Sequence, residues 1–145
     1  MGKDKLMSLV PKGTHTSNYA DIREANWVFY CMVISLSGSL QNARKRAEKF
    51  GWGFDLTLAH LVELWIDQGG RCAESDIILD HQKGQSYNKN PRKASVDRVD
   101  NNQGYVKGNV RLLTHWNNNA KSTYDDSIND LFISETYKFK NKPRT

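Results

Sequence analysis

Asp97 lies in a short segment, residues 94–100, in which apolar and polar residues alternate as they do in a half-buried β-strand. Its neighbours Asp100 and Asn101 add further oxygen donors. Carboxylate and carboxamide oxygens are ligands that Mg²⁺ prefers, and Mg²⁺ typically takes only one or two of them from a protein. Taken alone, an aspartate at such a position is more often a surface or capping residue.

A second group of polar residues follows in residues 109–122, which the spacing of apolar residues predicts to be a helix. The polar side of this helix would carry Arg111, His115, Asn118 and Ser122. It would therefore present a guanidinium, an imidazole and a carboxamide together. The same pattern also describes an ordinary solvated helix face, so these residues do not identify a site by themselves.

The N-terminal half of the chain is predicted to be helical. Residues 21–36 form one helix, the sequence Ser-Gly-Ser at 37–39 breaks the chain, and a basic helix follows over residues 40–50. Gly51 ends that helix, and Thr57 is the expected N-cap of another that stops at Gly69. The more polar residues 1–20 are predicted to form a flexible N-terminal arm.

The C-terminal half has the residue pattern of short strands and turns. A short β-type run at residues 77–79 and the alternating segment at 94–100 are predicted strands, separated by a polar, turn-rich stretch. A loop over residues 101–108 leads into the predicted helix 109–122, and a last helix spans about residues 125–137 before a basic tail. Strand, strand and helix would form one compact ββα unit. We therefore expect an α+β fold.

The bulk composition limits the possible classes of function. The formal net charge is +5 and the isoelectric point is about 9.2, which fits either a polyanionic partner or solubility alone. Two cysteines far apart exclude a cysteine-rich zinc site and suit a reducing cytosol. The apolar run at residues 27–36 is too short to cross a bilayer. We therefore expect neither a membrane protein nor an exported one.

The motifs in their order resemble a phage and bacterial branch of the HNH (ββα-metal) endonucleases. They are Ser-Val-Asp-Arg-Val-Asp at 95–100, Gly-Tyr at 104–105, Gly-Asn-Val at 108–110, and Asn118 followed by Lys121. The resemblance covers about residues 40–130. Several spaced motifs in the right order are more specific than any one of them.

The resemblance implies a DNA endonuclease that uses one Mg²⁺ or Mn²⁺ ion and needs no structural zinc. Asp97 and Asn118 match the two metal-ligand positions, and Asn109 matches the middle asparagine that pins a loop between strand and helix. Lys121 matches a basic residue expected to contact phosphate. Replacing Asp97 or Asn118 with alanine should then abolish cleavage while leaving the fold intact.

Arg98 departs from the usual pattern. Most HNH enzymes have a histidine here that takes a proton from the attacking water, which a guanidinium cannot do near neutral pH. Arg98 would instead contact the phosphate and stabilise charge in the transition state. The base would then be solvent hydroxide or another histidine, with His115 first and His81 second; for His115 a surface or packing role is an equal alternative.

These expectations divide the chain into an arm (1–20), a helical DNA-binding and support region (21–70), a ββα-metal nuclease unit (71–123) and a C-terminal helix with a basic tail (124–145). DNA, in a bacterial cytoplasm, is the expected partner, and the oligomeric state stays open. The expected backbone contacts are the basic residues Arg44, Lys45, Arg46, Lys93, Lys107, Arg111 and Lys121.

Two alternatives remain open. One is a degenerate HNH domain that binds DNA without cutting it. Arg98, at the position of the usual catalytic histidine, is the feature that supports this alternative. The other is a small basic protein-interaction or inhibitor module. A steep dependence of DNA binding on salt would argue against the interaction module.

Overall fold

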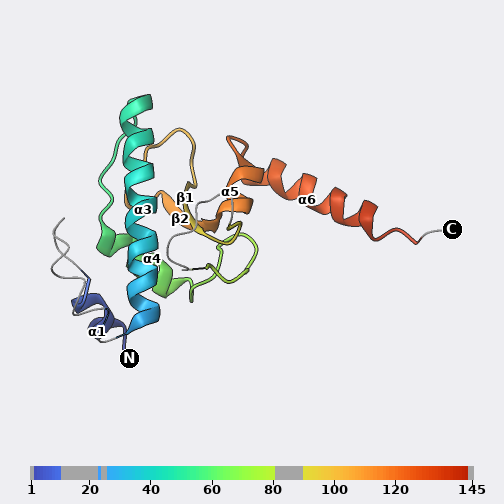
Figure 1. The fold of residues 1–145 in the computed structure, drawn as a ribbon. Coiled ribbons are helices and arrows are strands. Elements are labelled where there is room, and N and C mark those ends of the chain that lie inside the picture. Colours follow the sequence, from blue (N-terminus) through green and yellow to red (C-terminus); the bar gives the residue numbers. More distant parts are fainter. Residues whose placement is uncertain (1, 11–22, 24–25, 81–89, 144–145) are drawn as a thin grey trace.

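The long helix α3 (Trp27–Phe50) packs against α4 and β1 (Figure 1). The structure is a computed structural model that describes residues 2–10, 23, 26–80 and 90–143. Asn26 caps the start of α3 by accepting a hydrogen bond from the Phe29 amide, and Gly51 ends it in the left-handed conformation, with φ 69°. Gly51 therefore has its predicted role.

The predicted break at residues 37–39 is wrong, because α3 runs through it without interruption. The hydroxyl of Ser39 donates to the carbonyl of Ser35 within the helix and, at 2.7 Å, to the carbonyl of Ala94 in the neighbouring strand. The small, buried side chain of Ser39 lets the strand approach the helix closely here. Serine and glycine also favour turns, which is why the sequence predicts a break here.

Two shorter helices extend the N-terminal support. α4 (Leu58–Asp67) begins at its predicted N-cap Thr57 and ends before Gly69. α1 (Lys3–Ser8) lies within the predicted arm and contacts α4, where Lys3 pairs with Glu63 and Asp67. Val10, also in that arm, is buried in the core, and residues 1 and 11–20 lie outside the described residues.

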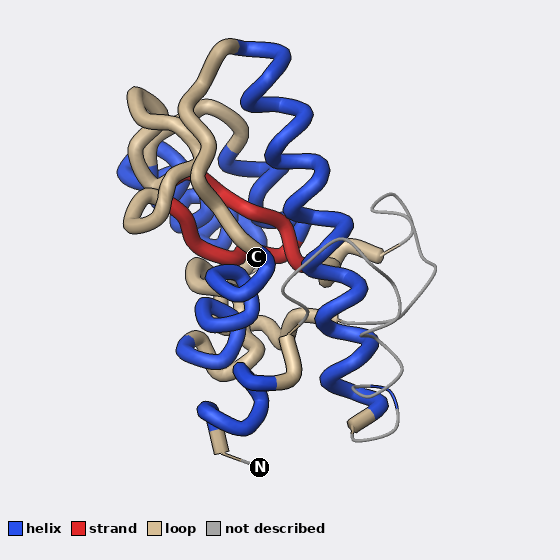
Figure 2. The backbone as a smooth tube through the Cα atoms, turned by 90° about the vertical axis from the view of Figure 1, so that its left-hand side faces the viewer, coloured by secondary structure: helices blue, strands red, loops and turns tan. Residues whose placement is uncertain are grey.

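The sheet has two antiparallel strands, β1 (Ala94–Arg98) and β2 (Val110–Thr114), with Val96 opposite Leu112. Figure 2 shows both strands beside the long helix. The helix predicted from residue 109 is therefore wrong in its first part. Leu112 and Leu113 are both fully buried although neighbours in a strand face opposite sides, so both faces of β2 are covered. Such a strand lacks strict alternation, and its apolar spacing resembled that of a helix.

The strand predicted at residues 77–79 is also wrong. This segment contributes only an isolated bridge between Arg71 and Ile78, and the side chains of Ile77 and Ile78 are exposed while Leu79 is buried. The ββα unit is therefore built from β1, the loop 99–109, β2 and α5 (His115–Lys121). A mixed α+β fold is confirmed.

The last helix, α6 (Asp126–Lys140), begins at its N-cap Asp125 and extends away from the rest of the molecule (Figure 1). Its start is held by ion pairs of Asp126 with Arg111 and Lys121. Among the described helices, none is long and apolar enough to cross a lipid bilayer.

Candidate functional site

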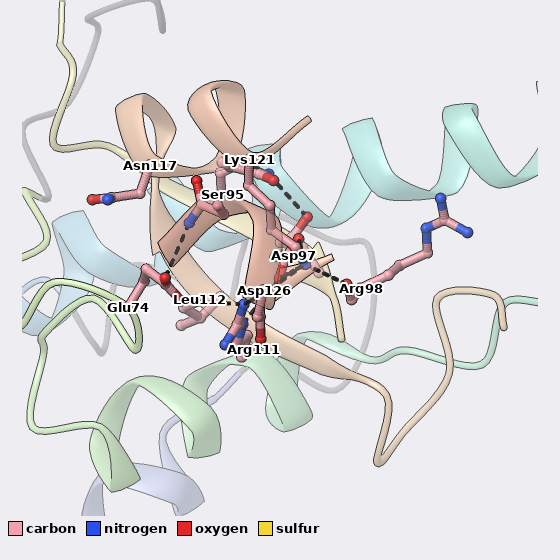
Figure 3. Close-up of polar contacts among 12 residues, drawn as sticks. Glu74, Ser95, Asp97, Arg98, Arg111, Leu112, Asn117, Lys121 and Asp126 are labelled. Carbon is pink, nitrogen blue, oxygen red and sulfur yellow. Dashed lines mark hydrogen bonds and ion pairs between the residues drawn. The ribbon is translucent and has the colours of Figure 1, made fainter. Parts of the chain in front are cut away.

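Asp97 projects from β1 toward α5 and is bonded by two cations (Figure 3). The ammonium of Lys121 lies 3.1 Å and 2.9 Å from its two carboxylate oxygens, and Arg111 Nε lies 2.9 Å from Oδ2. Lys121 Nζ also donates to the carbonyl of Arg98. Asp97 is 5% exposed and Lys121 is 0% exposed, so this is a buried ion pair.

Arg111 extends the same network to the start of α6. Its Nη2 lies 2.7 Å from Asp126 Oδ1 and 3.4 Å from Glu74 Oε2. Burial alone would lower the pKa of Arg111, but the hydrogen bonds that it donates to Asp97 and Asp126 raise this pKa above its ordinary value. Burial, followed by a hydrogen bond with Asp130, raises the pKa of Glu74. Arg111 therefore stays charged and joins β2 to α6.

Asn118 lies one turn before Lys121 on α5 and contacts the same strand. Its amide nitrogen donates to Ser95 Oγ at 2.7 Å and, at 3.4 Å, to the carbonyl of Val96. Ser95 and Asp97 are two residues apart on β1 and share one face. The fold thus brings Asp97 and Asn118 to one strand–helix contact, although their polar atoms bond different partners.

This arrangement does not fit a divalent cation between Asp97 and Asn118. Both oxygens of Asp97 are engaged by fixed positive charges, which would repel a metal ion placed against the carboxylate. Asn118 turns its nitrogen, not its oxygen, toward the strand. Among the described residues, no group of three or more His, Cys, Asp or Glu could hold a metal. Lys121 supplies the positive charge at this carboxylate.

Arg98 does not reach the Asp97 side of the strand. Its guanidinium stacks 3.6 Å from the centroid of the Trp52 ring and donates to the carbonyls of Asn101 and Gln103 (Figure 3 shows it directed away from Asp97). The side chain is 7% exposed. Arg98 therefore holds the loop after β1, and in this arrangement the expected phosphate contact is not available.

Asn109 forms the pin expected for the loop, although that loop joins two strands and not a strand and a helix. Its Oδ1 accepts from the Asp100 amide at 2.9 Å, and its Nδ2 donates to the carbonyls of Asp100 and Gly104. The loop also requires Gly104, because a Cβ there would clash with the backbone of Gly53. Gly108 has φ 87°, a conformation that favours glycine.

Replacing Asn109 with alanine should destabilise the fold by about 2–3 kcal/mol, since three hydrogen bonds are lost and the buried loop groups lose their partner. Urea unfolding measures this. Asn102→Ala is the matched control, because Asn102 is an exposed asparagine of the same loop. Equal midpoints for the two variants would contradict the role of Asn109.

A cleft of about 440 Å³ lies between α3, β1 and α5, beside the Asn118 contact. Lys45 and Arg46 of α3 line the cleft, and no acidic residue is among the described residues that line it. His115 is at its other wall, where burial and then the charge of Lys93 lower the pKa of the imidazole. A neutral His115 can accept a proton near neutral pH. The lining residues are Ser39, Asn42, Ala43, Lys45, Arg46, Ser95, Val96, Tyr105, His115, Asn118, Asn119, Ser122 and Thr123.

No family model, curated protein or solved structure matches this chain.

The basic residues predicted to contact DNA differ in their exposure. Lys45, Arg46 and Lys107 are exposed, whereas Arg111 and Lys121 are engaged in the network around Asp97. Arg44 is exposed but lies 5.2 Å from the centroid of the Phe54 ring, and it does not line the cleft. In this arrangement, Lys121 is therefore too deeply buried for the expected phosphate contact.

Other predictions lie outside the described residues or concern packing. His81 lies in residues 81–89, and the end of the basic tail is also outside the description. Cys72 is buried, and its sulfur accepts from the Thr114 amide, so it supports the junction of β2 and α5.

The sequence prediction missed the part that α3 plays in the cleft. Ser39, Asn42 and Arg46 occur at i, i+3 and i+7, which places them on one helix face. This signal was present in the sequence. A predicted break at residues 37–39 separates Ser39 from the other two residues, so the shared face is not evident from the predicted elements.

Proposed function

We propose that this chain is an HNH-type DNA endonuclease that binds the phosphodiester backbone in the cleft between α3, β1 and α5. The observation that carries the proposal is the charge of this cleft, which contains Lys45 and Arg46 and no acidic residue among its described lining. The motifs that resemble HNH enzymes lie along its other wall. The ββα order of the unit and the loop pin by Asn109 also support the proposal.

The lining of the cleft suits a phosphate group. An ammonium and a guanidinium can neutralise phosphate charge, and the polar side chains of Asn42, Asn118 and Asn119 line the cleft around them. Such contacts position a nucleic acid without reading its sequence. A backbone-binding cleft is therefore favoured over one that selects particular bases.

His115 is the group in the cleft that could remove a proton from water. Its neutral form is favoured by burial and by Lys93. Its Nε2 accepts from Asn119 Nδ2 at 3.0 Å, so a water must replace Asn119 at this nitrogen before His115 can act as a base. Arg98 cannot take this role because it is always charged and stacks on Trp52. The cleavage activity itself rests on the resemblance of the motifs.

The ion pair of Asp97 with Lys121 favours a second candidate, an HNH-like domain that binds DNA without cutting it. An HNH reaction needs a divalent cation, and the described arrangement does not accept one at Asp97. For cleavage by the expected route, Lys121 would have to leave the carboxylate. The two candidates share the cleft and differ in whether the bound strand is cut.

Nicking of supercoiled plasmid in Mg²⁺ or Mn²⁺, together with DNA binding, tests the proposal. We expect the wild-type protein to nick and Asn118→Ala and His115→Ala to lose most of this activity, while the exposed Asn102→Ala keeps it. Asp97→Ala would leave Lys121 buried without a carboxylate. Contrary to the expectation from the motifs, this variant should therefore be destabilised, and a loss of its activity would not identify a catalytic role. DNA binding without nicking would support the second candidate. If the protein neither binds nor nicks DNA, the proposal that the cleft binds DNA is wrong.

A further inference from the structure

A stack of two aromatic rings and a guanidinium lies at the C-terminal end of α3. The Phe50 ring lies against the Trp52 ring, with centroids 4.8 Å apart and an angle of 27° between the planes. The guanidinium of Arg98 lies 3.6 Å from the Trp52 centroid, so Arg98 and Phe50 occupy opposite faces of that ring. Arg98 also donates to the carbonyls of Asn101 and Gln103. The Trp52 ring is therefore held from behind, and Phe50 is the outermost ring of the stack.

Phe50 is exposed although it ends a buried stack. Its exposed fraction is 52%, whereas that of Arg98 is 7%. The ammonium of Lys49 lies 5.3 Å from the centroid of the Phe50 ring and belongs to an exposed side chain. A strongly hydrated ammonium on a four-carbon stem is not a fixed cover for a ring. Phe50 therefore presents an aromatic ring to solvent beside a positive charge.

This stack continues the cleft between α3, β1 and α5. Tyr105 lines the cleft, and the centroid of its ring lies 6.0 Å from that of Trp52. Arg46 of α3 also lines the cleft, and Lys49 and Phe50 follow it at i+3 and i+4. Residues at this spacing share one helix face, so Lys49 and Phe50 extend the cleft wall by one turn.

The charge along this face is positive and is not neutralised within the protein. In the described part of the chain, neither Arg46 nor Lys49 forms an ion pair or a side-chain hydrogen bond. Glu48 is the acidic residue of the same turn, but it is two positions from both Arg46 and Phe50 and points to another side of the helix. Unpaired cations beside an exposed aromatic ring are the groups that bind single-stranded nucleic acid, through its phosphates and its bases.

We propose that Phe50 is a stacking platform for an unpaired base of a DNA strand whose phosphates lie in the cleft. The inference rests on the proposed function, and it assigns single-stranded or partly unpaired DNA as the substrate class. The bound base takes the place of Lys49 on the Phe50 ring, and the Lys49 ammonium contacts a phosphate. Because the stack is already ordered, little side-chain freedom is lost on binding. Every base has a π face, so the contact adds affinity without selecting a sequence.

Fluorescence anisotropy with a single strand of about 12 thymidines and a blunt duplex of about 12 base pairs tests the platform. Phe50→Leu should weaken single-strand binding by about 5- to 100-fold, the range for one stacked base, and duplex binding by less than about twofold. The bases of a blunt duplex are stacked on each other and do not reach Phe50. Phe50→Tyr keeps an aromatic ring and should bind both DNAs like the wild type. Circular dichroism checks that each variant folds.

Phe132→Leu is the matched control, because Phe132 is 69% exposed on α6, which extends away from the rest of the molecule (Figure 1). This variant should bind both DNAs like the wild type. Single-strand binding that Phe50→Leu leaves unchanged, or an equal loss for the duplex, would overturn the platform while leaving the cleft in place. A wild-type protein that binds neither DNA would overturn both the platform and the proposed function.

Photocross-linking locates the base in the wild-type protein and needs no variant. One thymine of the single strand is replaced with iodouracil, which on irradiation loses iodine and bonds to an aromatic ring stacked on it. We expect the cross-link at Phe50, at the start of the tryptic peptide that follows Lys49. A cross-link confined to another exposed ring, such as Trp116 of α5 at 58% exposure, would place the base elsewhere and overturn the proposal.

Discussion

Replacing Lys121 with methionine should lower the free energy of unfolding by about 3–5 kcal/mol, because it removes the ammonium that neutralises a buried carboxylate. Lys121 is 0% exposed and contacts both oxygens of Asp97. Methionine keeps most of the side-chain volume, so the loss is electrostatic and not a cavity effect. Urea denaturation followed by circular dichroism measures it.

Lys107→Met is the matched control for this prediction. Lys107 is exposed, and its backbone, not its side chain, bonds Asp55. Its replacement should change stability by no more than about 0.5 kcal/mol. A Lys121→Met protein as stable as this control, with DNA binding reduced, would instead support the sequence prediction that Lys121 contacts phosphate.

A double-mutant cycle locates the source of the effect. In an Asp97→Asn background, Lys121→Met should cost less than in the wild type, because the carboxylate charge that Lys121 compensates is already gone. Arg111 remains beside position 97 and bonds Asp126 in either background. Equal costs in both backgrounds would show that Lys121 does not stabilise the fold through Asp97.

Removing both cations of the cleft, with Lys45→Ala and Arg46→Ala together, should weaken DNA binding by about 10- to 100-fold at moderate salt. Each lost phosphate contact should also reduce the slope of log K against log salt by about 1. Both side chains are exposed on α3 and line the cleft, so the fold should be unaffected. Fluorescence anisotropy over a series of salt concentrations measures both quantities.

Arg44→Ala distinguishes the cleft from the general positive charge of the helix. Arg44 is on the same helix but lies over the Phe54 ring, outside the cleft. It should lose only the weak attraction that any distant positive charge provides, which salt screens. If Arg44→Ala weakens binding as strongly as either single cleft variant, DNA does not bind in the cleft proposed here.

The sequence identified Asn109 and the neighbouring glycines because local geometry dictates their type. A loop that closes on itself needs a side chain with both a donor and an acceptor, and Asn109 supplies both. The helix ends at Gly51 and Thr57 were predicted for the same reason, since capping depends on a few adjacent residues. Features that are decided within a few residues can be predicted from the chain alone.

Errors in the predicted elements arose where burial on more than one side changed the pattern. β2 is covered on both faces, so Leu112 and Leu113 are both buried and the alternation typical of a strand disappears. The Ser-Gly-Ser segment of α3 lies against β1, where Ser39 bonds Ala94. In both places the surroundings, which are distant in sequence, outweighed local preference.

What the sequence by itself determined is the set of chemical groups, the loop pin and the mixed α+β class of the chain. Only the tertiary structure decides which groups are in contact. Lys121 pairs with Asp97, Arg98 stacks on Trp52, and α3 forms one wall of the cleft. The physical reason is that a side chain's partner depends on which face of its element it occupies and on what packs there. A change of element from helix to strand, as at Arg111, redirects the side chain and gives it a different partner.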